Sequence, residues 1–442
     1  MLDTSRASQP LRTPPRPELV RIMGRWALTG LVINSTIGVG IFKLPADVAR
    51  LVGDAAPWSY LVAAVFVGML VAVIAELGSQ FTQAGGQYLY ARTAFGPLAG
   101  IQTGWFVWLT RLAATSAIIN VLVAYLGEWW PGIGRFERGA VIVGLAGMLA
   151  VVNFRGIRTG VGFSNAITIA KLAMLALFIA AGLILLPGAV PASVPVPHSA
   201  AGWGDALVVL VYAFGGFENA MIPAAETKNP RRDAPFALFA ALAVVTVCYL
   251  LAHIVCMRGV PDLSTSKLPF ADAARAFAGT PGAKAIAIGV MLSAFGTVSA
   301  AFVTAPRLTY ALAERGDFPA FFAAVHPRHR TPHVSILIWT VLVCALSLGG
   351  GFLWNAILSV AARLITYGMT CASLIQMRRR FPDADAWRAP FGILAATVGL
   401  VFCGVLASRF ETSHVLIISG VAAAGLLNWM VVRSKSNPRH DV

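Results

Sequence analysis

Two glycine-containing stretches interrupt long apolar runs and could bind charged groups through the main chain. Residues 34–42 read N-S-T-I-G-V-G-I-F, and residues 212–219 read Y-A-F-G-G-F-E-N. Because glycine weakens a helix, each stretch predicts a break that leaves main-chain N–H and C=O groups unpaired. Free N–H groups at a helix start attract a carboxylate, and free carbonyl groups at a helix end accept from an ammonium. Together the two breaks predict a site for a zwitterion.

The first stretch would supply the groups that bind a carboxylate. The main-chain amides of Gly38, Val39 and Gly40 lie where the second half of the broken helix begins. The hydroxyl groups of Ser35 and Thr36 lie nearby and can donate to the same carboxylate.

Both stretches would supply the groups that bind an ammonium. The predicted acceptors are the carbonyl groups of Thr36, Ile37, Tyr212, Ala213 and Gly215. Aromatic side chains of the second stretch would cover the remainder of the ligand and act as a gate: Tyr212, Phe214 and Phe217. The alternative is that these aromatic side chains face lipid or only pack between helices.

The rest of the chain has the composition of a membrane protein. Of its 442 residues, 57% are hydrophobic and 12% are charged, whereas about 25% of a soluble domain is charged. About twelve apolar stretches can cross roughly 30 Å of hydrocarbon, and they must be helices because lipid satisfies no backbone group. The predicted spans are 26–50, 55–80, 97–127, 138–154, 162–186, 203–226, 234–257, 283–307, 333–350, 354–377, 390–408 and 413–433.

The basic residues orient these spans. The formal net charge is +15, but Lys and Arg gather in the two terminal segments and in alternate loops. The positive-inside rule then predicts both termini in the cytoplasm of a cell whose plasma membrane, a bacterial inner membrane, holds the protein. We expect cytoplasmic tails at 1–24 and 435–442 and no nucleic-acid partner. The first tail lacks the pattern of a signal peptide.

The two interrupted spans are the first and the sixth, so they lie five spans apart. An odd repeat length inverts the second copy in the membrane, and paired Gly-interrupted spans are typical of inverted-repeat transporters. The sequence therefore predicts one all-α membrane domain over 25–434. Its repeats would cover about 25–187 and about 202–378, and two added helices would cover about 388–434. The alternative is that the glycines only allow close helix packing.

Several stretches resemble the amino acid–polyamine–organocation (APC) family of transporters. They are G-V-G-I-F with Pro45, G-G-Q-Y-L-Y-A-R at 85–92, N-F-R-G at 153–156, T-I-A-K-L at 168–172, E-T-K-N-P-R-R at 226–232 and Y-A-L-A-E-R-G-D-F-P at 310–319. The resemblance implies the LeuT-type fold and secondary transport of amino acids or related amines by alternating access. Spans 1 and 6 would move against a scaffold of spans 3, 4, 8 and 9. It implies no cofactor and no enzymatic activity.

Two charged residues inside spans are candidates for ion coupling. In sodium-independent members of the family, a lysine at the position of Lys171 occupies the place where relatives bind sodium. It would tie span 5 to span 1 and to the hydroxyl groups of Thr297 and Ser299 in span 8. Glu218 follows the second break and either carries a proton or bonds the unwound backbone. We expect sodium independence, with proton coupling or exchange as the driving mode.

Two arginines also lie inside predicted spans. Arg111 and Arg363 would line the pathway, pair with Glu218, or join helices to one another. Because no outer acidic cluster is present, neutral L-amino acids are the favoured substrates. An antiporter of cationic amino acids or polyamines is the alternative, and an ion channel is a distant one. We expect no bound metal. Members of the resembled family that link to an accessory chain carry a cysteine between spans 3 and 4, and this sequence has none there, so we expect no accessory subunit.

Overall fold

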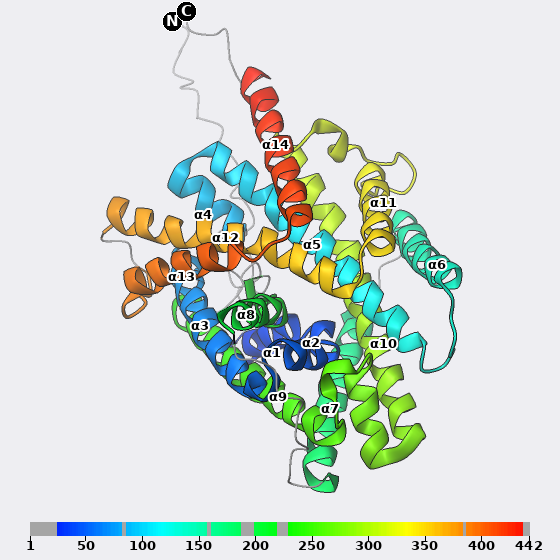
Figure 1. Cartoon of the computed structure of the whole chain (residues 1–442). Coiled ribbons are helices and arrows are strands. Elements are labelled where there is room, and N and C mark those ends of the chain that lie inside the picture. Colours follow the sequence, from blue (N-terminus) through cyan, green and yellow to red (C-terminus); the bar gives the residue numbers. More distant parts are fainter. Residues whose placement is uncertain are drawn as a thin grey trace, which may run out of the picture.

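The computed structural model describes residues 24–81, 85–156, 161–186, 199–218, 229–382 and 386–435. All regular elements within these ranges are helices. The two predicted tails lie outside them except for one residue each, as do residues 187–198 of the predicted loop between spans 5 and 6 and residues 219–226 of span 6. Figure 1 shows the helices in chain order.

The helices coincide with the predicted spans. The elements are α1 (Arg25–Thr36), η1 (Val39–Phe42), α2 (Leu44–Val52), η2 (Gly53–Ala55), α3 (Ala56–Gln80), α4 (Gly86–Phe95), α5 (Pro97–Leu126), α6 (Arg135–Phe154), α7 (Val161–Leu185), α8 (Ala200–Phe214), α9 (Pro230–Gly259), η5 (Leu263–Thr265), α10 (Pro269–Glu314), η6 (Ala320–Ala323), α11 (His333–Gly349), α12 (Phe352–Arg380), α13 (Gly392–Ala407) and α14 (Thr412–Lys435). Helix α4 was not predicted, and α10 begins before its span, with a kink at Gly279.

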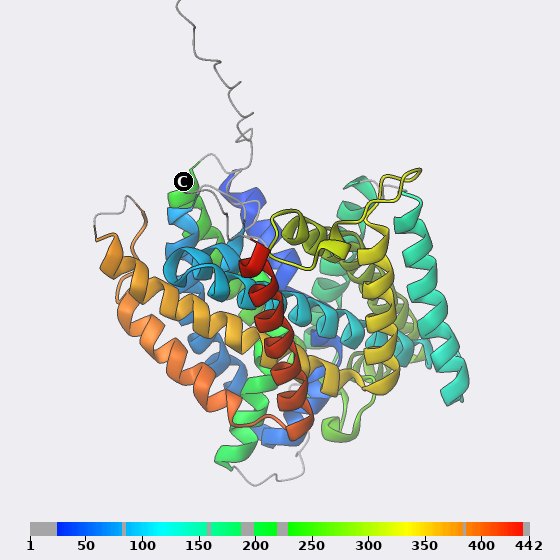
Figure 2. The same ribbon diagram turned by 90° about the horizontal axis from the view of Figure 1, so that it is seen from above.

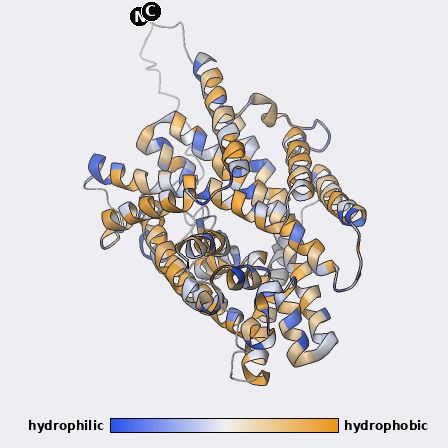
Figure 3. Ribbon diagram, in the orientation of Figure 1, coloured by the Kyte–Doolittle hydropathy of each residue, from blue (hydrophilic) through white to orange (hydrophobic). Residues whose placement is uncertain are grey.

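Length and composition mark most of these helices as membrane-crossing. Within the described ranges, 7 helical segments are long and apolar enough to span a bilayer. Shorter apolar helices accompany them: Ile169–Leu185, Ala200–Phe214, His333–Gly349 and Gly392–Ala407. Apolar residues dominate along the helices in Figure 3. An all-helical membrane protein is therefore confirmed, and the count of twelve spans and the LeuT-type repeat remain predictions.

The helices of the two breaks lie inside the bundle. Helix α8 packs on α2, α3 and α12, while α1 packs on α9 (Figure 1). The most apolar windows of α5 and α12 are each 72% buried within the protein, whereas that of α14 is 11% buried. Helix α14 accordingly runs along the outside of the bundle in Figure 2. The interior position of α1 and α8 suits a site that lipid does not reach.

Helices α5, α6, α10 and α11 form a contiguous group. Each of the four contacts the other three. They are the predicted spans 3, 4, 8 and 9, which were expected to form the scaffold. The contacts give this group the connectivity that a scaffold needs.

Candidate functional site

The predicted break in the first span is confirmed. Helix α1 ends at Thr36, Gly38 is extended, and the chain continues as a 3-10 turn from Val39 and as α2 from Leu44. The N–H group of Gly38 donates to the carbonyl oxygen of Thr36 at 2.6 Å. This amide, predicted to bind a carboxylate, is therefore engaged within the chain in the present conformation.

The second span also breaks where its glycines predict. Helix α8 ends at Phe214, and the extended Gly215 follows. Gly216 has a φ of 118°, a conformation that L side chains rarely adopt. Phe217 and Glu218 form a short 3-10 turn. The rest of the predicted sixth span, from residue 219, lies outside the described residues.

The two breaks touch each other through their glycines. A Cβ atom on Gly216 would collide with the main-chain carbonyl oxygen of Ser35. A Cβ atom on Gly40 would meet the ring of Tyr212 at 2.7 Å. A side chain at either position would push the broken helices apart. The sequence argument that paired the two breaks is thus supported by direct contact between them.

A tyrosine that the sequence argument missed joins the two breaks. The hydroxyl oxygen of Tyr249, on α9, lies 2.9 Å from the carbonyl oxygen of Thr36 and 3.0 Å from that of Ala213. Both carbonyl groups were predicted to accept from an ammonium. Tyr249 is fully buried. A hydroxyl group in an apolar span needs a hydrogen-bond partner inside the protein. This requirement could have marked Tyr249 in the sequence as a residue of the interior.

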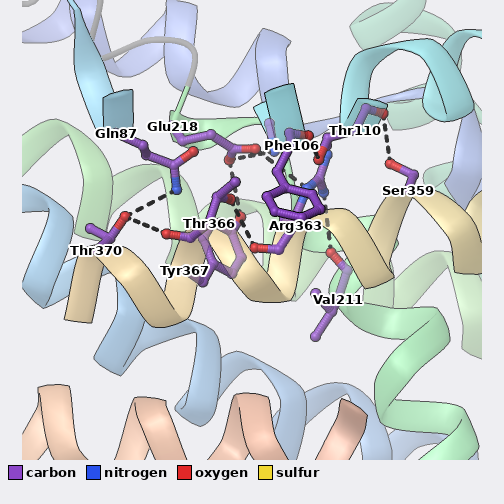
Figure 4. Close-up of polar contacts among 11 residues, drawn as sticks. Gln87, Phe106, Thr110, Val211, Glu218, Ser359, Arg363, Thr366, Tyr367 and Thr370 are labelled. Carbon is purple, nitrogen blue, oxygen red and sulfur yellow. Dashed lines mark hydrogen bonds and ion pairs between the residues drawn. The ribbon is translucent and has the colours of Figure 1, made fainter. Parts of the chain in front are cut away.

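Glu218 is held at the second break by three groups. The N–H group of Gly216 donates to its Oε2 at 2.9 Å, and the hydroxyl group of Tyr367 donates to the same oxygen at 3.1 Å. Nε of Arg363 lies 3.4 Å from Oε1. Figure 4 shows the side chains of Glu218, Arg363 and Tyr367 converging beside α12. The suggested bonding of Glu218 to the unwound backbone and the suggested pairing of an arginine with Glu218 are both supported by contacts, and its role as a proton carrier stays a prediction.

Both arginines of the predicted pathway lie near Glu218. The guanidinium of Arg363 occupies the space where a Cβ atom of Gly215 would be, and its Nη1 donates to the carbonyl oxygen of Val211 at 3.4 Å. Its Nε is buried and makes no hydrogen bond. Arg111, on α5, interacts electrostatically with Glu218. Two guanidinium groups therefore share one carboxylate beside the break.

Lys171 donates hydrogen bonds to the first broken helix and none to α10. Its Nζ donates to the main-chain oxygen of Asn34 at 3.0 Å and to the side-chain Oδ1 of Asn34 at 2.8 Å. The hydroxyl group of Thr297 instead donates to the carbonyl oxygen of Ser293 in its own helix. The hydroxyl group of Ser299 is buried and unbonded. The predicted tie to span 1 is confirmed, and the predicted tie to Thr297 and Ser299 is wrong.

The reason for this difference is local. Threonine in a helix readily donates to the carbonyl group one turn earlier, so the hydroxyl group of Thr297 has a partner within its own helix and does not need the lysine. Asn34 offers two oxygens at the end of α1, where carbonyl groups lack helical partners. Asn34 therefore binds the ammonium group of Lys171, although the sequence argument did not include Asn34 among the site residues.

The three predicted gate aromatics point into the protein. Phe214 packs on Tyr249 with ring centroids 5.4 Å apart, and Phe217 stacks on Tyr367 at 5.9 Å. Tyr212 lies edge-on to Phe352, beside Gly40. All three are buried. The alternative that they face lipid is wrong for the described conformation, and their contact with a ligand stays a prediction.

Two stretches that carried the family resemblance meet near one end of the bundle. Asp317, from 310–319, accepts from the hydroxyl group of Tyr88 and pairs with Arg92, both from 85–92. Burial and the hydrogen bond to Asp317 raise the pKa of Tyr88. Asn428, on α14, donates to the main-chain oxygen of Asp317 at 2.6 Å. The two stretches thus form one polar cluster that links α4, the segment after α10 and α14.

Comparison with known proteins agrees with this arrangement. The family model described as Amino acid permease matches residues 23–429, which run from before α1 into α14 and include both breaks. The chain belongs to the amino acid permease family. This confirms the resemblance to the APC transporters, so the permease is a multi-pass membrane protein of a transporter family.

Individual relatives are transporters as well. The permease is 29% identical to the serine/threonine exchanger SteT of Bacillus subtilis over 323 residues, which is 70% of this chain and 72% of the relative. It is 26% identical to the methylthioribose transporter of Bacillus subtilis over 413 residues, or 87% of each chain. These relatives have different named substrates, so similarity alone leaves the substrate of the permease to be argued from its site.

Proposed function

We propose that the permease is a sodium-independent secondary transporter of neutral L-amino acids that works by alternating access in a bacterial inner membrane. The observation that carries this proposal is the contact between the two broken helices, with Lys171 bound to the end of the first. This contact supports a site in which main-chain donors and acceptors of both breaks bind a zwitterion, which needs both kinds of group.

Sodium independence rests on the position of Lys171. Its ammonium group takes both the main-chain and the side-chain oxygen of Asn34. Oxygen atoms of this kind are the ligands that a hard cation prefers. A protein-borne cation at the end of α1 repels a second cation and occupies acceptors that sodium would use.

The charges beside the second break favour neutral over cationic substrates. Arg111 and Arg363 both interact with Glu218. A cationic amino acid or a polyamine would bring a further positive charge to two guanidinium groups that already share one carboxylate. Like charges in a site of low dielectric repel strongly. This disfavours the cationic antiporter that the sequence leaves open.

Alternating access has a structural basis in the packing. Helices α1 and α8 end at their breaks, and Tyr249 and Gly216 hold the broken ends together. Helices α5, α6, α10 and α11 form the contiguous group against which the broken helices would move. We propose that both termini are cytoplasmic and that the chain works without an accessory subunit.

A competition assay in proteoliposomes tests the substrate class. Vesicles loaded with an unlabelled amino acid mixture exchange it for one labelled amino acid, and candidate competitors are added outside. Excess neutral L-amino acids should suppress exchange, whereas lysine, arginine and a polyamine should not. Suppression by the cationic compounds alone would contradict the proposal in favour of the cationic antiporter.

A further inference from the structure

A groove beside the first turns of α9 combines a cation with an aromatic wall. It encloses about 520 Å³ and is lined by Arg232, Pro235, Phe236, Phe239, Ala240 and Trp387. Arg232 brings a positive charge, whereas the other five side chains carry none. A volume of this size can hold part of a small molecule or of a lipid.

The groove lies where predicted spans begin. Arg232 comes two residues before the span at 234–257, and Trp387 comes three residues before the span at 390–408. Arg25, which borders the groove, comes directly before the span at 26–50. In the predicted topology these are spans 1, 7 and 11, which all begin on the same face of the membrane. Arginine and tryptophan at this level are typical of the boundary between hydrocarbon and headgroups.

The apolar wall of the groove is open to the outside of the bundle. Phe236 and Phe239 lie three residues apart on one face of α9 and are 37% and 40% exposed. The ring of Trp387 lies 6.4 Å from that of Phe239, and its main-chain N–H group donates to Oγ of Ser79 at 3.0 Å. Helix α3 therefore holds this side of the wall in place. In a bilayer, acyl chains cover an apolar face at such a position.

Two arginines flank the wall without a carboxylate partner. The guanidinium carbon of Arg25 lies 5.3 Å from the ring centroid of Phe236, and Arg232 lies one helical turn before Phe236 on α9. Both arginines are exposed, and neither forms an ion pair within the described residues. The neighbouring Asp233 is buried and accepts from the main-chain N–H group of Asn229 at 3.1 Å. Unpaired cations at a membrane surface attract the phosphates of anionic lipids.

The two halves of the groove decide between possible occupants. Residues 1–23, which precede α1, hold four arginines and two acidic residues, so their net positive charge disfavours them beside two further arginines. Inorganic phosphate would pair with the arginines and leave the aromatic wall uncovered. An anionic phospholipid carries a phosphate and acyl chains in one molecule and therefore matches both halves.

We propose that this groove binds an anionic phospholipid. Its phosphate lies between Arg25 and Arg232, and an acyl chain runs along Phe236, Phe239 and Trp387. The inference goes beyond amino acid transport and does not depend on it. Because Arg25 begins α1, the bound lipid contacts the helix that ends at the first break.

Native mass spectrometry of the purified full-length permease tests the site. The protein is titrated in detergent with phosphatidylglycerol or with phosphatidylcholine of the same acyl chains, and the affinity for the first bound lipid is measured. One arginine near the surface contributes about fivefold in affinity for an anionic lipid. The wild type should therefore bind phosphatidylglycerol at least about tenfold more tightly than phosphatidylcholine.

Variants separate the two halves of the groove. Arg232→Gln should reduce the preference for phosphatidylglycerol about fivefold, and the double variant Arg25→Gln/Arg232→Gln should remove it. Phe239→Ala should weaken the binding of both lipids, because it removes part of the wall and no charge. Arg315→Gln is the matched control, since Arg315 is an exposed arginine that follows α10 and does not line the groove. This variant should keep the preference of the wild type.

The opposite results would overturn the inference. Equal affinities of the wild type for the two lipids would do so, as would a full preference in Arg232→Gln or an equal loss in Arg315→Gln. Wild-type binding of both lipids by Phe239→Ala would rule out the acyl-chain wall. Displacement of the lipid by excess inorganic phosphate would show a site for free anions instead. These outcomes are independent of the proposed function, which fails if the permease catalyses no counterflow of any amino acid.

Discussion

Gly216 lies so close to Ser35 that a Cβ atom on the glycine would collide with the serine carbonyl oxygen. One residue belongs to the break after α8 and the other to the end of α1. The contact is between main chains, so no rotamer change can relieve it. Two segments far apart in the sequence are therefore fitted to each other at the glycine.

The first prediction concerns this contact. Gly216→Ala should lower transport at least tenfold, because alanine is strained at a φ of 118° and its Cβ atom would separate the breaks. The measurement is the initial rate of counterflow at matched amounts of reconstituted protein. Gly30→Ala is the control, since Gly30 lies within α1 with open space around it. Equal rates for Gly216→Ala and wild type would show that the contact is dispensable.

The second prediction concerns the bridge between the breaks. Tyr249→Phe removes the hydroxyl group that joins the carbonyl groups of Thr36 and Ala213 across the two breaks. We expect a lower thermal unfolding temperature, because a lost buried hydrogen bond costs about 1 kcal/mol, and a slower transport rate. Tyr310→Phe, which removes an exposed hydroxyl group bonded to Glu314, is the control. An unchanged unfolding temperature and rate would rule out a role for the bridge.

The third prediction compares a buried with an exposed ion pair. Glu76 is fully buried and accepts from Nε and Nη2 of Arg378 at 2.7 and 2.6 Å. Arg378→Gln leaves this carboxylate without its cation, so the free energy of unfolding should fall by about 3 kcal/mol. Arg409→Gln breaks the exposed pair with Asp205 and should change it by less than about 1 kcal/mol. A similar loss of unfolding free energy in the two variants would contradict the conclusion that the buried ion pair stabilises the protein more than the exposed one.

The sequence allowed the breaks to be predicted because their cause is local. Glycine weakens a helix, so breaks at the ends of α1 and α8 could be predicted from the residues themselves. The helix bounds follow in the same way from apolar length and charged ends. The positions of Lys171, Glu218 and the two arginines inside spans also marked them as buried groups that need partners.

Apart from the pairing of an arginine with Glu218 and the tie of Lys171 to span 1, the partners themselves could not be predicted. Which side chains meet depends on how each helix is rotated, and a helix that is apolar on all sides carries no periodic pattern to fix its rotation. Tyr249 and Asn34 were missed for this reason, and Thr297 and Ser299 were wrongly assigned to Lys171. The contact between Tyr88 and Asp317 was likewise hidden, although both lie in stretches that carried the family resemblance.

Uptake of a labelled neutral amino acid with and without sodium tests the central claim most directly. Proteoliposomes containing the permease are diluted into medium with sodium or with choline as the only difference. The account predicts equal initial rates in the two media, because Lys171 already occupies the oxygens of Asn34 at the end of α1. Uptake that requires inward sodium would contradict the assigned role of Lys171 and the sodium-independent mechanism.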